Sequence, residues 1–91
     1  MNRKKFQELY SRILRGDKNN IAYSDACDFV EELGFDICRQ KGTSHRIYKM
    51  KSVPDIINLQ NDKGNAKAYQ VSQIRKVIEK YKIGDDKDEQ G

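Results

Sequence analysis

The spacing of the apolar residues changes at Gly34, and this change limits the folds that are open to the chain. Before Gly34, apolar residues recur at intervals of three and four, as on one face of an amphipathic helix. After it, apolar and polar residues partly alternate, as in half-buried strands. The helical spacing returns over Tyr69–Lys82. We therefore expect an α+β fold in the order α-α-β-β-β-α, with an antiparallel sheet covered by helices on one face.

Glycines and a capping residue indicate the ends of the first two helices. The first helix is expected from Arg3 to Arg15, because Gly16 follows its apolar stripe. The second helix is expected from Asp25 to Leu33. Ser24 would be its N-cap, and the glycine at position 34 would adopt the left-handed conformation that ends a helix.

Three strands are expected between the second and third helices. They cover Phe35–Gln40, Ser44–Met50 and Ile56–Gln60. Lys41–Thr43 would form the first turn, and Asn61–Asn65 would form a loop before the last helix. Pro54 is expected to lie between strands, because proline cannot donate a hydrogen bond to a β-ladder.

Both faces of the middle strand are partly apolar. One face carries His45 and Ile47. The other face carries Arg46, Tyr48 and Met50. The pattern leaves open which face is buried, so Tyr48 belongs either to the core or to a surface where it could stack on a nucleic-acid base.

Length and charge point to one small basic domain. The chain has 91 residues, of which 36% are hydrophobic and 35% charged, so its core is thin. The net charge is +4, yet the segment 84–91 holds four acids and one base. The remainder therefore carries +7, which favours a polyanionic partner such as RNA or DNA. The segment 84–91 is expected to be a disordered acidic tail.

The cysteines and the apolar content exclude several classes of protein. Cys27 and Cys38 are too few for a disulfide scaffold and are expected to be buried, reduced thiols. No apolar run reaches the length of a membrane helix, so no membrane partner is expected. The start Met1–Lys5 leads into an amphipathic segment rather than an apolar one, which does not fit a signal peptide. A soluble cytoplasmic protein is therefore expected.

His45 is the sole histidine and the candidate for proton-transfer chemistry. Gly42 precedes it and allows a tight turn or the close approach of a phosphate. Thr43 and Ser44 offer hydroxyl and backbone N–H groups beside it. A lone histidine at the start of a strand is more often an ordinary surface residue, so residue type and setting leave both interpretations open.

Positive charge surrounds this histidine in the sequence and indicates an RNA-binding segment. The RNA contacts are expected at Lys41, Gly42, Thr43, Ser44, Arg46 and Lys49. No group of His, Cys, Asp or Glu has the spacing of a metal site, and no glycine-rich phosphate loop is present. Chemistry without a metal or cofactor is therefore expected.

Several ordered segments of the chain resemble the HicA (YcfA-like) mRNA interferase toxins. The similar segments are Leu33–Phe35, Arg39–Tyr48, Asn58–Gln60, Lys67–Val71 and Ile74–Tyr81. The run Gly42–His45 alone is a weak signal, but the ordered set is fairly specific. The resemblance covers about two thirds of the chain or more.

The resemblance implies a double-stranded-RNA-binding-like α-β-β-β-α fold, a ribonuclease activity on mRNA and a HicB-type antitoxin as partner. It implies that His45 is catalytic and that Gly42 is the turn glycine. It divides the chain into an N-terminal helical extension (1–20), a HicA-like domain (21–83) and the acidic tail (84–91). The chain departs from the family in two ways. Many members have a second histidine near the third strand, where this chain has Ile57–Gln60. The extra N-terminal helix has no counterpart in the short members.

The mechanism expected from these residues is metal-independent cleavage, in which His45 takes the proton of an RNA 2′-hydroxyl. Lys41, Arg46 and Lys49 would stabilise the negative charge that develops at the phosphate. The alternative is a non-catalytic RNA-binding domain of the same fold, and a third is a protein-interaction domain that docks a partner on its open sheet face or edge strand. The oligomeric state is left open.

Overall fold

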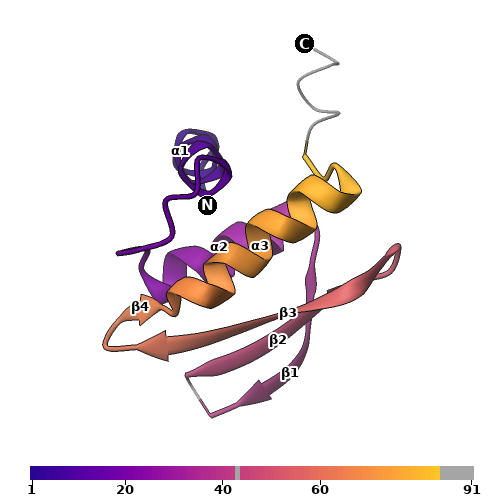
Figure 1. The fold of residues 1–91 in the computed structure, drawn as a ribbon. Coiled ribbons are helices and arrows are strands. Elements are labelled where there is room, and N and C mark those ends of the chain that lie inside the picture. Colours follow the sequence, from indigo (N-terminus) through magenta and orange to yellow (C-terminus); the bar gives the residue numbers. More distant parts are fainter. Residues whose placement is uncertain (43, 85–91) are drawn as a thin grey trace.

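The computed structural model describes residues 1–42 and 44–84 and shows an α+β fold (Figure 1). Its elements are α1 (Arg3–Leu14), α2 (Tyr23–Leu33), β1 (Asp36–Lys41), β2 (His45–Met50), β3 (Val53–Asp62), β4 (Asn65–Ala66) and α3 (Ala68–Tyr81). The strands form one antiparallel sheet in the order β1-β2-β3-β4. The expected element order is confirmed, with β4 as an addition. The predicted tail lies outside the described residues except for Gly84.

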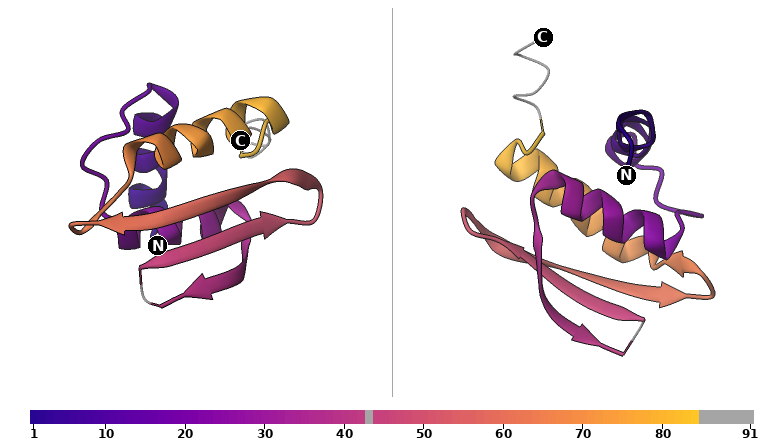
Figure 2. Two further views of the ribbon diagram at one scale, coloured as in Figure 1. Left: turned by 60° about the horizontal axis from the view of Figure 1, so that its bottom comes forward. Right: turned by 180° about the vertical axis from the view of Figure 1, so that it is seen from behind.

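The elements are arranged in three layers (Figures 1 and 2). The twisted sheet forms one layer, α2 and α3 lie side by side on one of its faces, and α1 lies on the far side of these two helices. The sheet contributes Tyr48, Ile57 and Leu59 to the core, and none of them is exposed. The helices contribute Phe29 and Ile74, which are equally buried. No helix of the described residues covers the other face of the sheet (Figure 2).

The N-terminal helix α1 is part of the same core. Its residues Leu9 and Ile13 are 3% and 1% exposed. The ring of Phe6 stacks on that of Phe29 in α2, with 5.0 Å between the ring centroids. Near the other end of the chain, the Tyr10 hydroxyl donates a hydrogen bond to the Ile83 carbonyl at 3.1 Å. The helix therefore covers apolar surface of α2 and α3 that water would otherwise contact.

The start of α2 differs from the prediction. Ala22 is the N-cap and no side chain caps the helix, so the prediction of Ser24 as N-cap is wrong. The physical reason is the turn between β3 and β4, because the Tyr23 N–H donates to the carbonyl of Gly64 in that turn at 2.9 Å. A backbone partner thus satisfies a donor that a capping side chain usually satisfies. At the other end, Gly34 ends α2 with φ at 113°, as predicted.

The bounds of β1 and β2 agree with the prediction to within one residue. The third strand, β3, is longer than predicted, and Pro54 lies inside it rather than before it. The β4 strand pairs only with Asn61 and Asp62, so β3 has a neighbour on one side alone at Pro54. A proline is tolerated at such an edge because no ladder hydrogen bond is lost. Because β3 extends to Asp62 and β4 begins at Asn65, the predicted loop at 61–65 is partly strand.

The two cysteines lie in different environments. Cys27 is buried in α2, as predicted. Cys38 is exposed, so the prediction of a buried thiol is wrong for this residue. It occupies the position where the register of β1 against β2 shifts between Ile37 and Arg39. Among the described residues, none of the helices has the length and apolar character needed to cross a bilayer.

Candidate functional site

His45 is the first residue of β2 and lies between two other strands. It pairs with Lys41 of β1 on one side and with Gln60 of β3 on the other. The turn that leads into it contains Gly42 with φ at 63°, a conformation that glycine adopts without strain. Gly42 therefore has the backbone role predicted for it, whereas Thr43 lies outside the described residues. Ser44 is exposed, and its carbonyl accepts a hydrogen bond from Asn61 at 2.9 Å.

The structure decides which face of β2 is buried. Tyr48 is completely buried between the sheet and the helices. Because side chains alternate along a strand, His45 and Ile47 point to the face without helices, and His45 is half-buried there. Tyr48 therefore belongs to the core, and the idea that it stacks on a base is wrong.

Arg46 lies on the helix side of the sheet, away from His45. Its Nη1 is 3.6 Å from Oε2 of Glu31 in α2 and 3.4 Å from the Tyr48 hydroxyl. That hydroxyl donates a hydrogen bond to Glu31 at 2.6 Å. The hydrogen bond with Tyr48 raises the pKa of Arg46 above its ordinary value. The structure thus separates Arg46 from the other cations predicted to surround the histidine.

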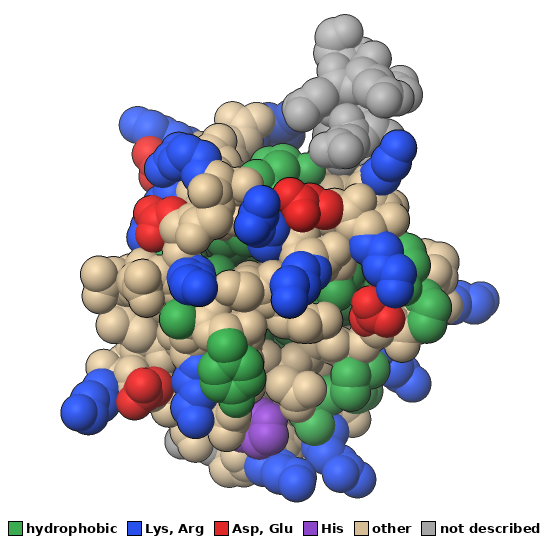
Figure 3. All heavy atoms as spheres, viewed as in Figure 1, with side chains coloured by type: hydrophobic (Ala, Val, Ile, Leu, Met, Phe, Trp, Pro, Cys, Tyr) green, Lys and Arg blue, Asp and Glu red, His purple; other side chains and the backbone are tan. Residues whose placement is uncertain are grey.

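Three cations share the open sheet face with His45. Lys41 is its direct cross-strand partner, and Lys49 lies four residues along the same strand. Arg39, which the sequence reasoning did not single out, pairs with Ile47 on this face. All three are exposed. Figure 3 shows the histidine at the surface with Lys and Arg side chains beside it.

A shallow hollow of about 440 Å³ opens beside the histidine. Its lining residues are His45, Ile56, Asn58, Gln60, Tyr69, Gln70 and Gln73. They come from β2, β3 and the first turns of α3. Nε2 of His45 is 3.4 Å from Oδ1 of Asn58, which lies on the neighbouring strand. Among the described residues that line the hollow, none carries a carboxylate.

On the α3 side of this hollow, Gln70 holds the helix against β3. It is only 4% exposed. Its Oε1 accepts a hydrogen bond from the Gln60 backbone N–H at 2.7 Å, and its Nε2 donates to Oε1 of Gln60 at 2.8 Å. The first bond satisfies the backbone N–H of Gln60, which lies on the edge of β3 just before the two residues that pair with β4. Gln70 therefore joins α3 to the strand that faces His45.

The residues that the sequence reasoning missed are those contributed by β3 and α3. Asn58 and Gln60 alternate with apolar residues on β3, which indicates a polar strand face. Tyr69 is 66% exposed, and only its place in the first turn of α3 brings it near the histidine. The alternation of amides could have been read from the sequence. The proximity of Tyr69 depends on how α3 packs against the sheet.

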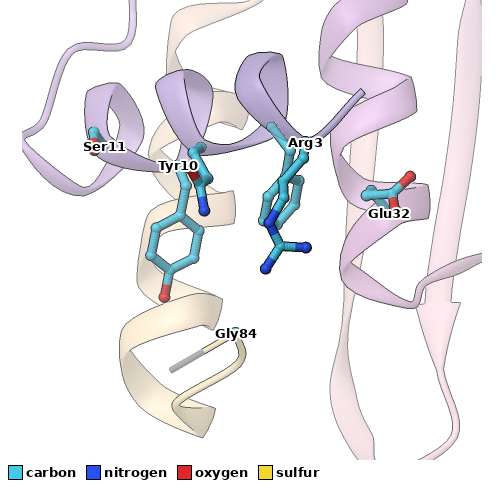
Figure 4. Close-up of a pocket in the computed structure, with 7 residues that line it drawn as sticks. Arg3, Tyr10, Ser11, Glu32 and Gly84 are labelled. Atoms are coloured by element: carbon cyan, nitrogen blue, oxygen red, sulfur yellow. The ribbon is translucent and has the colours of Figure 1, made fainter. Parts of the chain in front are cut away.

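A second hollow lies beside α1 (Figure 4). Arg3, Tyr10 and Ser11 of α1 line it together with Glu32 of α2 and Gly84. None of the described residues that were predicted to act on RNA contributes to it. Within residues 1–42 and 44–84, no three His, Cys, Asp or Glu side chains come together as metal ligands.

No protein-family model, curated protein or solved structure matches the chain.

Proposed function

We propose that the protein is a metal-independent endoribonuclease that cleaves mRNA, the toxin of a HicA-type toxin–antitoxin pair, and that His45 is its catalytic residue. The observation that carries the proposal is the position of His45 on the open face of the sheet, directly opposite Lys41. Exposed cations and a hollow free of carboxylates adjoin it. Such a surface favours binding of a negatively charged phosphodiester backbone. The proposed setting is the cytoplasm, with a HicB-type protein as inhibitory partner.

The proposed reaction is an internal transfer of the phosphodiester. His45 removes the proton of the 2′-hydroxyl, and the resulting oxygen attacks the adjacent phosphorus. The bond from phosphorus to the 5′-oxygen breaks, which leaves a 2′,3′-cyclic phosphate and a 5′-hydroxyl. The 5′-oxygen receives its proton from water or from the protonated histidine.

Two neighbouring groups support this role for the histidine. When Nε2 of His45 carries the proton, it can donate a hydrogen bond to the side-chain Oδ1 of Asn58, and Nδ1 is then the basic nitrogen. Lys41, across the strand pair, is placed to stabilise the charge that develops on the phosphate oxygens. Lys49 and Arg39 extend this positive surface along the sheet. Arg46, on the opposite face, has no part in the proposed chemistry.

A non-catalytic RNA-binding domain is the second candidate, and one observation favours it. Among the described residues, His45 has no second histidine or carboxylate as a hydrogen-bonded partner, and Asn58 cannot exchange protons at neutral pH. A single histidine would have to serve both proton-transfer steps. This alternative predicts salt-dependent RNA binding without cleavage.

The test is cleavage of end-labelled RNA by the purified protein and by the variants His45→Ala and His45→Gln. General acid–base catalysis contributes about 10²- to 10⁴-fold, so both variants should lose activity by a factor in that range. Products should end in 2′,3′-cyclic phosphate, chelator should not stop the reaction, and DNA should be resistant because it lacks the 2′-hydroxyl. Gln7→Ala, an exposed neutral change on α1, is the matched control.

Equal cleavage by parent and His45→Ala, with both folded, would exclude His45 as the catalytic residue. Salt-dependent binding of RNA by the parent without any cleavage would instead favour the second candidate.

A further inference from the structure

We infer that the hollow beside His45 is a nucleobase subsite, in which Tyr69 is the stacking surface and the side-chain amides contact the edge of the base. The inference deepens the proposed function and rests on it for the identity of the ligand as RNA. It makes Tyr69 a specificity-determining residue of the same site.

Tyr69 has the exposure and the support that a stacking surface requires. Large apolar side chains exposed on the described part of the molecule are Ile37, Ile56 and Tyr69, and the last two line this hollow. The Tyr69 hydroxyl is 3.4 Å from Nε2 of Gln70, which is itself buried. The ring is therefore exposed but anchored at its hydroxyl, so little conformational entropy is lost when a base stacks on it.

Two of the amides near the ring, those of Gln60 and Gln70, are held in place by hydrogen bonds, and groups that can bind a ligand remain. Oε1 of Gln60 accepts from Gln70 at 2.8 Å. Nε2 of Gln60 makes no hydrogen bond with the described residues, and it remains a donor. Gln73 and Asn58 add further amides to the lining. Amide groups combine donors and acceptors in the way that the edges of nucleobases do.

The position of the hollow relative to His45 fits a nucleotide next to the cleaved bond. Gln60 is the direct cross-strand partner of His45. Paired residues of this kind have Cβ atoms about 4.5–5.5 Å apart. A base held between Tyr69 and Gln60 would therefore belong to one of the two nucleotides that flank a phosphate at His45. The open face of the sheet, with Lys41 and Lys49, would receive the phosphate backbone.

The experiment measures base stacking without relying on cleavage. The probe is a short 2′-O-methyl RNA, which lacks the nucleophile, with 2-aminopurine or a fluorescent cytidine analogue placed at each position in turn. The full-length protein should quench one position. Tyr69→Ala should weaken binding about five- to 150-fold, because stacking on an aromatic side chain accounts for that much of the affinity. Tyr69→Phe keeps the ring and should restore the quenching.

Two controls separate stacking from a general loss of affinity. An RNA that is abasic at the quenched position should bind parent and Tyr69→Ala equally. Gln7→Ala should bind every probe as the parent does. In cleavage assays, Tyr69→Ala should raise KM far more than it lowers kcat, because His45 remains in place.

The outcomes distinguish this inference from the proposed function. Cleavage that depends on His45, together with parent-like binding and KM for Tyr69→Ala, would overturn the subsite and leave the ribonuclease intact. Quenching that depends on Tyr69 in a protein that cleaves no RNA would support the base subsite and overturn the ribonuclease. Quenching that is equal at every probe position, or that survives Tyr69→Ala, would also overturn the subsite.

Discussion

Lys41 and Arg46 are five positions apart in the sequence but lie on opposite faces of the sheet. Lys41 shares the exposed face with His45 because the two residues are cross-strand partners. Arg46 points to α2, where Glu31 is 3.6 Å away. Both residues were expected to contact RNA, and the structure gives them different environments. Substitutions at the two positions should therefore change different properties of the protein.

We expect Lys41→Ala to weaken RNA binding several-fold and to reduce the salt dependence of binding, because one phosphate contact is lost. Its free energy of unfolding should change by no more than about 0.5 kcal/mol, as for an ordinary surface residue. Arg46→Ala should lower the free energy of unfolding by about 1 kcal/mol, since it removes a partly exposed ion pair and a neighbour of the Tyr48 hydroxyl. Urea denaturation and RNA titrations at several salt concentrations measure the two effects. A large loss of RNA affinity in Arg46→Ala alone would contradict this assignment.

Part of the site could be predicted from the sequence because it is local in the chain. The turn glycine Gly42 and His45 lie in one continuous segment, and so do the flanking cations. The orientation of Arg46 could not be predicted, because both faces of β2 are partly apolar and only the buried Tyr48 decides between them. Tyr69 could not be placed, because its proximity to the histidine depends on a contact between α3 and β3.

At the scale of the elements, α1 behaves as a component of the core rather than an appendage. It contributes the buried residues Leu9 and Ile13 and the aromatic stack of Phe6 on Phe29. Without it, the outer surfaces of α2 and α3 would be exposed to water. A chain of this size has a small core, so each helix that covers it has a large effect on stability.

We expect Ile13→Ala to lower the free energy of unfolding by about 2–5 kcal/mol, because it removes buried methyl groups and leaves a cavity between α1 and the other helices. Ser11→Ala, on the exposed face of the same helix, should change it by less than about 0.5 kcal/mol. Denaturation followed by circular dichroism measures both. Equal stabilities for the two variants would show that α1 is dispensable for folding.

The helices and the strands β1 and β2 were predicted to within two residues, whereas the bounds of β3 and the whole of β4 were missed, for a physical reason. Each helix has an apolar stripe over several turns, and Gly34 ends α2 as expected. The two-residue strand β4 is too short to produce an alternating pattern. It pairs only because the chain returns beside Asn61 and Asp62. The same strand explains why Ser24 is not a cap, because the Gly64 carbonyl next to it satisfies the N–H at the start of α2.

At the scale of the whole molecule, two tyrosine hydroxyls are buried between the sheet and α2. Burial and the nearby Cys27 thiol raise the pKa of Tyr23 to about 12, and its hydroxyl has no hydrogen-bond partner among the described residues. Burial, followed by the hydrogen bond to Glu31, raises the pKa of Tyr48 still further above its ordinary value. Loss of either proton therefore costs more free energy in the folded protein than in the unfolded chain.

The raised pKa values of Tyr23 and Tyr48 predict how the free energy of unfolding depends on pH in alkaline solution. In the unfolded chain tyrosine loses its proton near pH 10, whereas in the folded protein Tyr23 and Tyr48 keep theirs. Above pH 10 the folded state therefore binds more protons than the unfolded state, and the free energy of unfolding decreases as the pH rises. The stabilisation is complete below pH 10 and is lost progressively up to the folded pKa of each group. The slope should approach about 1.4 kcal/mol per pH unit for each tyrosine.

Urea denaturation between pH 9 and 12 measures this slope, and Tyr23→Phe isolates one of the two contributions. The variant removes a buried hydroxyl without a partner, so its stability at neutral pH should equal or exceed that of the parent. Its slope above pH 10 should be reduced by the contribution of one tyrosine. Tyr69→Phe, which changes an exposed tyrosine, should leave the slope as it is in the parent. If Tyr23→Phe instead retains the full slope, Tyr23 does not couple proton loss to unfolding, and the packing of the sheet against α2 tolerates a tyrosinate at that position.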